Sequence, residues 1–320
     1  MSSVSPTPER LRRPALIAGA ALATAALFTS VAVIPLAALV IAPLTPQPGL
    51  ALERRRGGAA LFSMLPIVVV TLAMWGGAAA ASIYAVTFGV LTLVLAASIR
   101  RAESIDTAVA LSTAAVLVGV CAVTWSAAGG PEHVLEHLRA GLDAGRARLI
   151  EMGREGGASA EILRRFEEHG PRVVETMVRL APALLIDAVG AIVLVNLLLV
   201  RSLQRVAGEE PAFGDLTRWR CPAALIWVLI AAGYAVFLSA PVVRWTAING
   251  LAVVLGIYFC QGMAIIRFYF QRWQVAFWAR ALTYCFVALE WLVAGGVVLL
   301  GIFDLWGDFR RLTPRPAEEE

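Results

Sequence analysis

The chain has 320 residues, of which 59% are hydrophobic and 16% are charged, and its mean hydropathy is +0.76. Soluble domains average about 25% charged residues, so this composition excludes an ordinary soluble protein. All 27 basic residues are arginine, which excludes a lysine Schiff base and the lysine of a nucleotide-binding P-loop. The formal net charge is +4, and because the arginines stand at the ends of apolar runs, they indicate membrane orientation and not nucleic-acid binding.

Long apolar runs follow one another along the sequence, and several exceed the roughly 20 helical residues that cross a bilayer core. The runs lie within Pro14–Leu44, Ala59–Ile99, Ile105–Ala127, Val173–Val200, Cys221–Ala240, Thr246–Ile266 and Ala281–Phe303. A barrel is excluded because barrel strands alternate polar and apolar residues. The sequence therefore predicts an all-α fold, a polytopic transmembrane helical bundle with about eight spans, or seven to nine. We expect one integral-membrane domain over residues 1–320.

The first half of the chain contains three irregular places. Pro35 predicts a kink or break in the first run. Thr45–Gly58, with two prolines and three consecutive arginines, is expected to be a loop. Ala59–Ile99 is too long for one span, so the pair Gly76–Gly77 predicts a hairpin. Ser104 is expected to cap the next helix.

Residues 129–176 form an insertion that differs from the apolar runs. A helix is predicted to begin at Pro131 and to end at a cluster of glycines, and its apolar residues recur at roughly helical spacing: Leu135, Leu138, Leu142, Leu149 and Met152. Ser159 is expected to cap a second short helix, which ends at Gly170–Pro171 and turns Ile162 and Phe166 inward. We expect these amphipathic helices outside the bilayer core, either on the membrane surface or covering the bundle.

The distribution of arginines predicts the orientation of the loops. One set of alternating loops carries most of the arginines, among them Arg54–Arg56, Arg100–Arg101 and Arg201–Arg220. The other set carries Gly76–Gly77, the insertion with its balanced charge, and a turn with Arg244 alone. The positive-inside rule therefore places the first set in the cytoplasm and His133–His169 outside.

Two acidic residues lie inside apolar runs, where ionisable groups are expensive and are functional candidates by default. Asp187 shares a helical stripe with alanines and a glycine, and Glu290 lies in the last run. The sequence predicts a substrate or ion site at these carboxylates, and the alternative is a buried hydrogen bond or ion pair with an arginine. Asn249, Tyr258 and Gln261 add polar groups to another run, either as a cavity wall or as hydrogen bonds between packed helices.

The sequence shows no catalytic set. His133 and His137 have zinc-binding spacing, but the glutamate of an HExxH motif is misplaced, so an exposed helix face is the better interpretation. The four cysteines form no CxxC pair or zinc spacing and are read as small buried hydrophobes. We therefore expect no catalytic residues, no metal site, no cofactor and no enzymatic activity.

Three stretches resemble the YybS-like family of predicted bacterial membrane proteins: APLTPQPGLALERRRGG, NGLAVVLGIYFCQGMAIIRFYF and LLGIFDLWGDFRRL. This family is grouped by distant similarity with substrate-binding subunits of energy-coupling-factor transporters. The resemblance implies a helical bundle in the bacterial plasma membrane, with a small-molecule cavity that opens outward. It suggests a transporter-type protein that binds or translocates a small solute and takes any ATP coupling from partner subunits. The alternative is a non-transporting scaffold that recruits envelope or division proteins.

Overall fold

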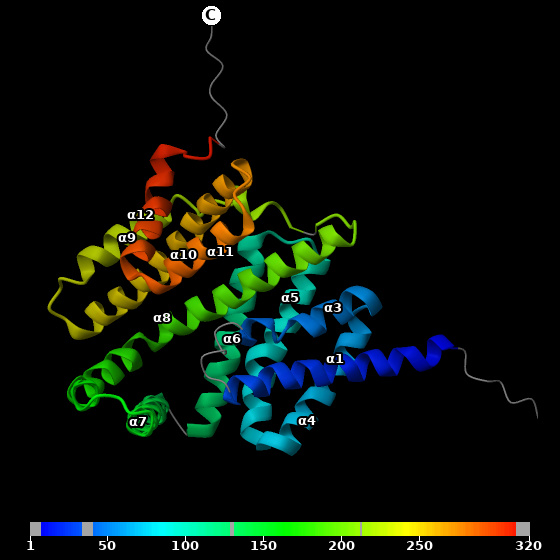
Figure 1. The fold of residues 1–320 in the computed structure, drawn as a ribbon, viewed down its shortest axis with the longest axis horizontal. Coiled ribbons are helices and arrows are strands. Elements are labelled where there is room, and N and C mark those ends of the chain that lie inside the picture. Colours follow the sequence, from blue (N-terminus) through cyan, green and yellow to red (C-terminus); the bar gives the residue numbers. More distant parts are fainter. Residues whose placement is uncertain (1–7, 34–40, 129–130, 212, 312–320) are drawn as a thin grey trace, which may run out of the picture. The chain divides into compact units, whose positions relative to one another are not determined.

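The computed structural model describes residues 8–33, 41–128, 131–211 and 213–311, and helices account for most of these segments. The described segments contain no strand, which confirms the predicted all-α class. The chain groups into two compact units (Figure 1): Met1–Glu168 with Ala188–Phe213 form unit 1, and His169–Asp187 with Gly214–Glu320 form unit 2. The expected break at Pro35 lies outside the described residues.

The first part of unit 1 is a set of packed apolar helices. These are α1 (Pro8–Val33), α3 (Gln47–Arg56), α4 (Gly58–Tyr84), α5 (Val90–Arg100) and α6 (Ile105–Ala128). Tyr84 is 1% exposed, and its ring meets that of Phe28 edge-on, with 5.5 Å between the centroids. A π-helical turn, Ala85–Gly89, continues α4 into α5.

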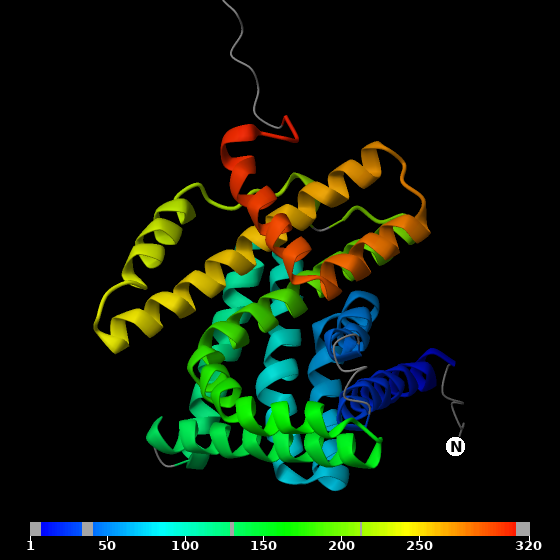
Figure 2. The same cartoon turned by 60° about the vertical axis from the view of Figure 1, so that its left-hand side comes forward.

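The predicted hairpin and helix cap of this unit are confirmed. Gly77 has φ +77° and ψ 176°, a backbone conformation open to glycine, and the chain reverses direction there. The second arm of the hairpin packs against α6, and Figure 2 shows the helices of this part from a second side. Ser104 Oγ accepts a hydrogen bond of 3.2 Å from the amide of Thr107 and caps α6.

The expected loop Thr45–Gly58 is mostly helical. A 3-10 turn, Ala42–Leu44, leads into α3, and a proline stands in the first turn of α3. A proline at that position needs no helical N–H partner and favours the start of a helix. Leu50 and Leu52 are buried, at 3% and 5% exposure. The prolines therefore begin this helix rather than prevent it.

The insertion consists of α7 (Pro131–Glu155) and the first part of α8 (Ala160–Val206). The side chain of Ser159 accepts from the amide of Ile162, which confirms the predicted cap. The expected end at Gly170–Pro171 is wrong, because α8, which has 47 residues in all, continues through it to Val206. A proline removes only one N–H from the ladder, and buried Val174 and Val178 hold the helix beyond it.

The predicted inward position of two residues of the insertion is also wrong. Ile162 is 51% exposed and Phe166 is 53% exposed. Instead, α7 and the beginning of α8 are tied by their charged residues, since Arg154 Nη2 lies 2.8 Å from Glu167 Oε1. The apolar residues of the α8 start are therefore left uncovered by the described part of the chain.

Unit 2 is organised around α10 (Pro241–Arg272). The helices α9 (Leu225–Ala235) and α12 (Trp291–Gly307) pack against it, and α11 (Phe277–Leu289) precedes α12. The crossing of α10 and α12 is close: a methyl group on Gly301 would overlap the carbonyl oxygen of Tyr258, and one on Gly262 would overlap that of Val297. Figures 1 and 2 both show this crossing.

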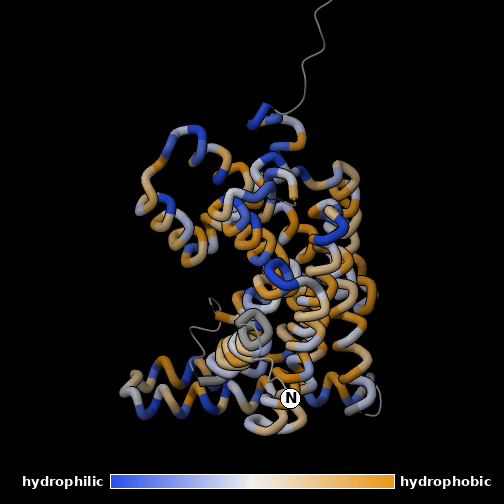
Figure 3. The backbone as a smooth tube through the Cα atoms, turned by 90° about the vertical axis from the view of Figure 1, so that its right-hand side faces the viewer, coloured by the Kyte–Doolittle hydropathy of each residue, from blue (hydrophilic) through white to orange (hydrophobic). Residues whose placement is uncertain are grey.

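Membrane-spanning helices are fewer than the expected eight. Among the described residues, five helices are long and apolar enough to cross a bilayer, or six if α11 and α12 form one broken span. In Figure 3, the helices of the chain carry the colour of hydrophobic residues over much of their length. The expected span Cys221–Ala240 contains only α9, whose 11 residues reach about 16 Å. The expected span Ala281–Phe303 bends by 103° between α11 and α12.

Candidate functional site

The contact between α8 and α10 in unit 2 brings a carboxylate against a glycine. A methyl group on Gly256 would lie 2.7 Å from Asp187 Oδ1 and 3.0 Å from the carboxylate carbon. The Asp187 side chain therefore packs directly against the backbone of α10 at Gly256. Any larger residue at position 256 would have to displace the carboxylate.

Both residues lie in the middle of apolar segments. Asp187 is near the centre of the run Val173–Val200 within α8, and Gly256 is near the centre of α10. Within the described segments, no hydrogen bond or ion pair engages the Asp187 side chain. A charged carboxylate at the centre of a bilayer costs about 2.5–3.5 kcal/mol on insertion scales. The contact thus holds an acidic side chain that has no hydrogen-bond or ion-pair partner among the described residues and that lies within an apolar segment.

Asn249 joins α10 to α8 one turn from Asp187. Its Nδ2 donates to the carbonyl of Arg179 at 2.8 Å, and its Oδ1 accepts from the amide of Ala183 at 3.1 Å. In an undisturbed helix these two backbone groups would bond to each other, but Pro182 disturbs the ladder at this place. Asn249 therefore bridges α8 where its backbone is weakest, as neighbouring helices do around prolines in membranes.

Arg179, the arginine of α8 nearest to Asp187 in the sequence, already has partners. Arg179 Nε lies 2.7 Å from Glu175 Oε1, and its guanidinium carbon is 4.8 Å from the ring centre of Trp245. Arginine and tryptophan together are typical of the membrane–water interface. Arg179 is therefore engaged two turns away from Asp187, at the level of the Trp245 ring.

The opposite face of α10 carries a second polar cluster. Gln261 is 2% exposed; its Oε1 accepts from the amide of Cys221 at 2.9 Å, and its Nε2 donates to Asp304 Oδ2 at 3.1 Å. Arg310 Nη2 also binds Asp304 Oδ2, at 2.7 Å, and neither side chain of this ion pair is exposed. Because the Gln261, Asp304 and Arg310 side chains bind one another or the backbone, with only Arg310 Nε left without a partner in the described segments, this cluster is a structural contact and not an open binding site.

The same cluster also binds the segment that precedes α9. Arg310 Nη1 donates to the carbonyl oxygens of Thr217 and Trp219, at 2.7 and 2.9 Å. Arg220 pairs with Asp308. The sequence analysis did not select Asp304 or Arg310. The sequence feature that could have indicated these two residues is the group of charged residues in LLGIFDLWGDFRRL, the last of the three stretches that carried the resemblance.

The remaining two sequence candidates lie apart from Asp187. Tyr258 is fully buried beside Cys221 and Val254, and its hydroxyl has no hydrogen-bond partner in the described segments. Glu290 is exposed at the break between α11 and α12, where its backbone precedes the first residue of α12. Of the five predicted site residues, the structure brings Asp187 and Asn249 to one face of α10 and Tyr258 and Gln261 to the other.

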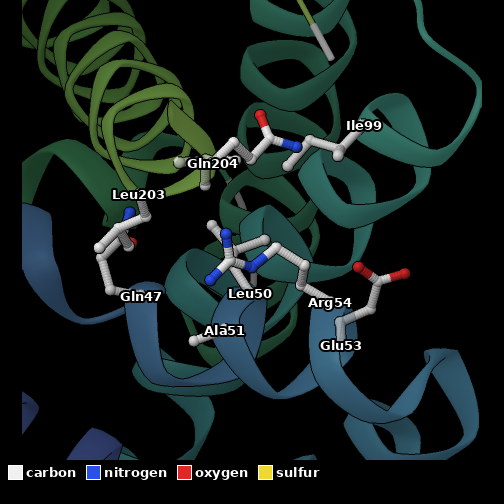
Figure 4. Close-up of a pocket in the computed structure, with 9 residues that line it drawn as sticks. Gln47, Leu50, Ala51, Glu53, Arg54, Ile99, Leu203 and Gln204 are labelled. Atoms are coloured by element: carbon white, nitrogen blue, oxygen red, sulfur yellow. The ribbon is translucent and has the colours of Figure 1, made fainter. Parts of the chain in front are cut away.

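Unit 1 contains a small hollow beside α3, shown in Figure 4. Its volume is about 30 Å³, room for about two water molecules. Arg54 and Glu53 line it, but Arg54 Nη1 lies 3.4 Å from Glu209 Oε2, and Arg100 Nη1 lies 2.8 Å from Glu53 Oε1. With its charges paired and its volume this small, the hollow is a weaker candidate than the Asp187 contact.

Fold and site together define a polytopic helical membrane protein with an ionisable residue inside its helices. A family model described as "Predicted membrane protein (DUF2232)" matches residues 22–305, and the chain belongs to this family. The match runs from α1 to α12 and so includes parts of both units. A search of curated proteins and a search of solved structures each gave no match.

Proposed function

We propose that this protein is of transporter type and binds or translocates a small solute in the bacterial plasma membrane. The observation that carries the proposal is Asp187, an unpaired carboxylate at mid-height of α8 that faces Gly256 of α10. Intramembrane acidic residues are rare, and by default they are candidates for substrate and ion pathways. The resemblance to the YybS-like family, and through it to substrate-binding subunits of energy-coupling-factor transporters, supports the same reading.

The proposed protein has no energy source of its own. The sequence lacks a P-loop lysine and a catalytic set, so in this proposal the protein is not an enzyme and ATP coupling comes from partner subunits. The lipid bilayer and such membrane or ATPase subunits are its proposed partners, and nucleic acid is not among them.

Ligand-dependent thermal stability tests the proposal. The full chain, purified in mild detergent, is screened against vitamins and other small metabolites. A ligand present at about 100 times its Kd adds about 2.7 kcal/mol to the free energy of unfolding. We expect such a shift in wild type and its loss in Asp187→Asn. Glu168→Gln, which changes an exposed carboxylate of the same helix, is expected to keep the shift. A broad panel without any shift, and without a retained ATPase partner, contradicts the proposal.

A second function, a scaffold for envelope or division proteins, is favoured by the surface of α7. Leu135, Leu149 and Met152 are each more than half exposed on this helix. If the protein is a scaffold, the double variant Leu135→Asp, Leu149→Asp should abolish co-purification of membrane partners. The variants Asp187→Asn and Glu290→Gln should leave co-purification intact. The transporter proposal expects the solute-dependent shift to follow Asp187 and to be insensitive to the α7 variants.

A further inference from the structure

We propose that Asp187 is a proton-binding site of the solute pathway proposed above. This inference rests on the proposed function and adds the chemical identity of the ion. It starts from the same contact: the carboxylate lies against α10, 2.7 Å from the position of a methyl group on Gly256. A carboxylate held in apolar surroundings without a partner needs a cation to remove its charge.

The geometry favours a proton over larger cations. Hard metal ions such as Ca²⁺ and Mg²⁺ take about six or more oxygen ligands. The described residues hold no group of three or more His, Cys, Asp or Glu side chains that suits a metal. The nearest amide, that of Asn249, is occupied by the backbone of α8.

No charged or titratable group around the contact neutralises the Asp187 carboxylate in place of a proton. On α10, Cys260 lies one turn from Gly256 and interacts electrostatically with Asp187, but a thiol brings no positive charge. On α8, Arg179 is held by Glu175 and Trp245. No other side chain in the described segments hydrogen-bonds or pairs with Asp187. Proton binding converts the carboxylate into a neutral carboxylic acid, which fits this apolar contact.

Loss of the proton has a structural consequence. The carboxylate then carries a full charge between two apolar helices, and water has to reach it or the helices have to part at Gly256. Pro182 lies close by and lacks a backbone N–H, and the side chain of Asn249 bonds the neighbouring backbone groups, so the helical ladder of α8 is weakened about one turn from the charge. Proton release and separation of α8 from α10 are thereby linked.

Chemical labelling of the wild-type chain tests this site directly. Dicyclohexylcarbodiimide is an apolar reagent that modifies protonated carboxyl groups in apolar surroundings, and the adduct is located by mass spectrometry. In liposomes at mildly acidic pH we expect labelling at Asp187, and a severalfold loss of labelling at alkaline pH. Asp304 is more deeply buried, at 1% exposure, and is paired with Arg310, so it serves as a paired internal reference and is expected to stay unmodified. Absence of label at Asp187, or equal label at Asp304, overturns the inference.

A matched pair of glycine variants tests the contact itself. Gly256→Ala forces the carboxylate away from α10 toward water, and we expect labelling of Asp187 to fall severalfold. Gly250→Ala, on the same helix with open space around its new methyl group, is expected to label as wild type does. Equal labelling in both variants overturns the role of the contact.

The labelling needs no solute, so the two proposals fail separately. If Asp187 is labelled and no solute stabilises the protein, the proton site stands and the solute-binding function fails. If a solute stabilises the protein through Asp187 but the residue is never labelled, the function stands and the proton inference is overturned.

Discussion

The side chain of Asn249 hydrogen-bonds two backbone groups of α8 beside Pro182. Replacing Asn249 tests whether this structural role, and not solute binding, is its function. Asn249→Leu leaves the carbonyl of Arg179 and the amide of Ala183 without their bridge. A buried polar group left without a partner costs about 1–3 kcal/mol, so we expect a lower Tm in detergent. In a Pro182→Ala background the ladder can close by itself, and the same replacement should then cost less. An equal loss in both backgrounds would show that Asn249 does not serve the proline.

At the level of single residues, the sequence identified the charged group but not what it touches. Asp187 stood out because an acid inside an apolar run is rare. Its neighbour Gly256 has no side chain, so no polarity pattern indicates it. Asp304 and Arg310 escaped notice because they stand at the end of the last run, where charged residues are ordinary. Only the fold brings Arg310 and Gln261 together on Asp304.

Among the helices, the crossing of α10 and α12 depends on the absence of side chains. In Gly301→Ala the new methyl group would overlap the backbone of Tyr258, so the helices have to move apart. Overpacking of this kind costs about 1–3 kcal/mol, and we expect a clear fall in Tm. Gly295→Ala, on the same helix with open space around it, should be nearly silent. Comparable losses in the two variants would contradict the close crossing.

Helices were predictable where one continuous apolar run had clear caps. The run Ile105–Ala127 and the helix α6 coincide almost fully, because Ser104 marks the start. The break at Glu290 was not predictable in this way, since no proline or glycine stands there and the composition continues across it. The helix α3 was missed for the opposite reason: two prolines and three arginines resemble a loop, although Pro48 stands within its first turn and Leu50 is buried.

For the whole molecule, the continuity of α8 sharpens the predicted orientation. One uninterrupted helix, Ala160–Val206, separates the insertion from the arginine-rich segment that follows, so the two flanks should lie on opposite sides of the membrane. Cysteines at Glu155 and Glu210, in a chain without its native cysteines, report this with an impermeant maleimide in intact cells. Both positions are exposed and avoid the positive φ of Gly157 and Gly208.

We expect labelling at position 155 and none at position 210. The reverse result would invert the predicted orientation. Labelling at both positions would mean that α8 does not cross the membrane.

The length of α8 also gives it a mechanical property. Its 47 residues measure about 70 Å, more than twice the thickness of the hydrocarbon core. From Pro182 back to Ala160 the helix extends for about 33 Å, so a tilt of about 10° at the proline moves the far end by about 6 Å. A change of one charge at Asp187 is therefore placed next to the pivot of a long lever, whose far arm carries the ion pair with the end of α7.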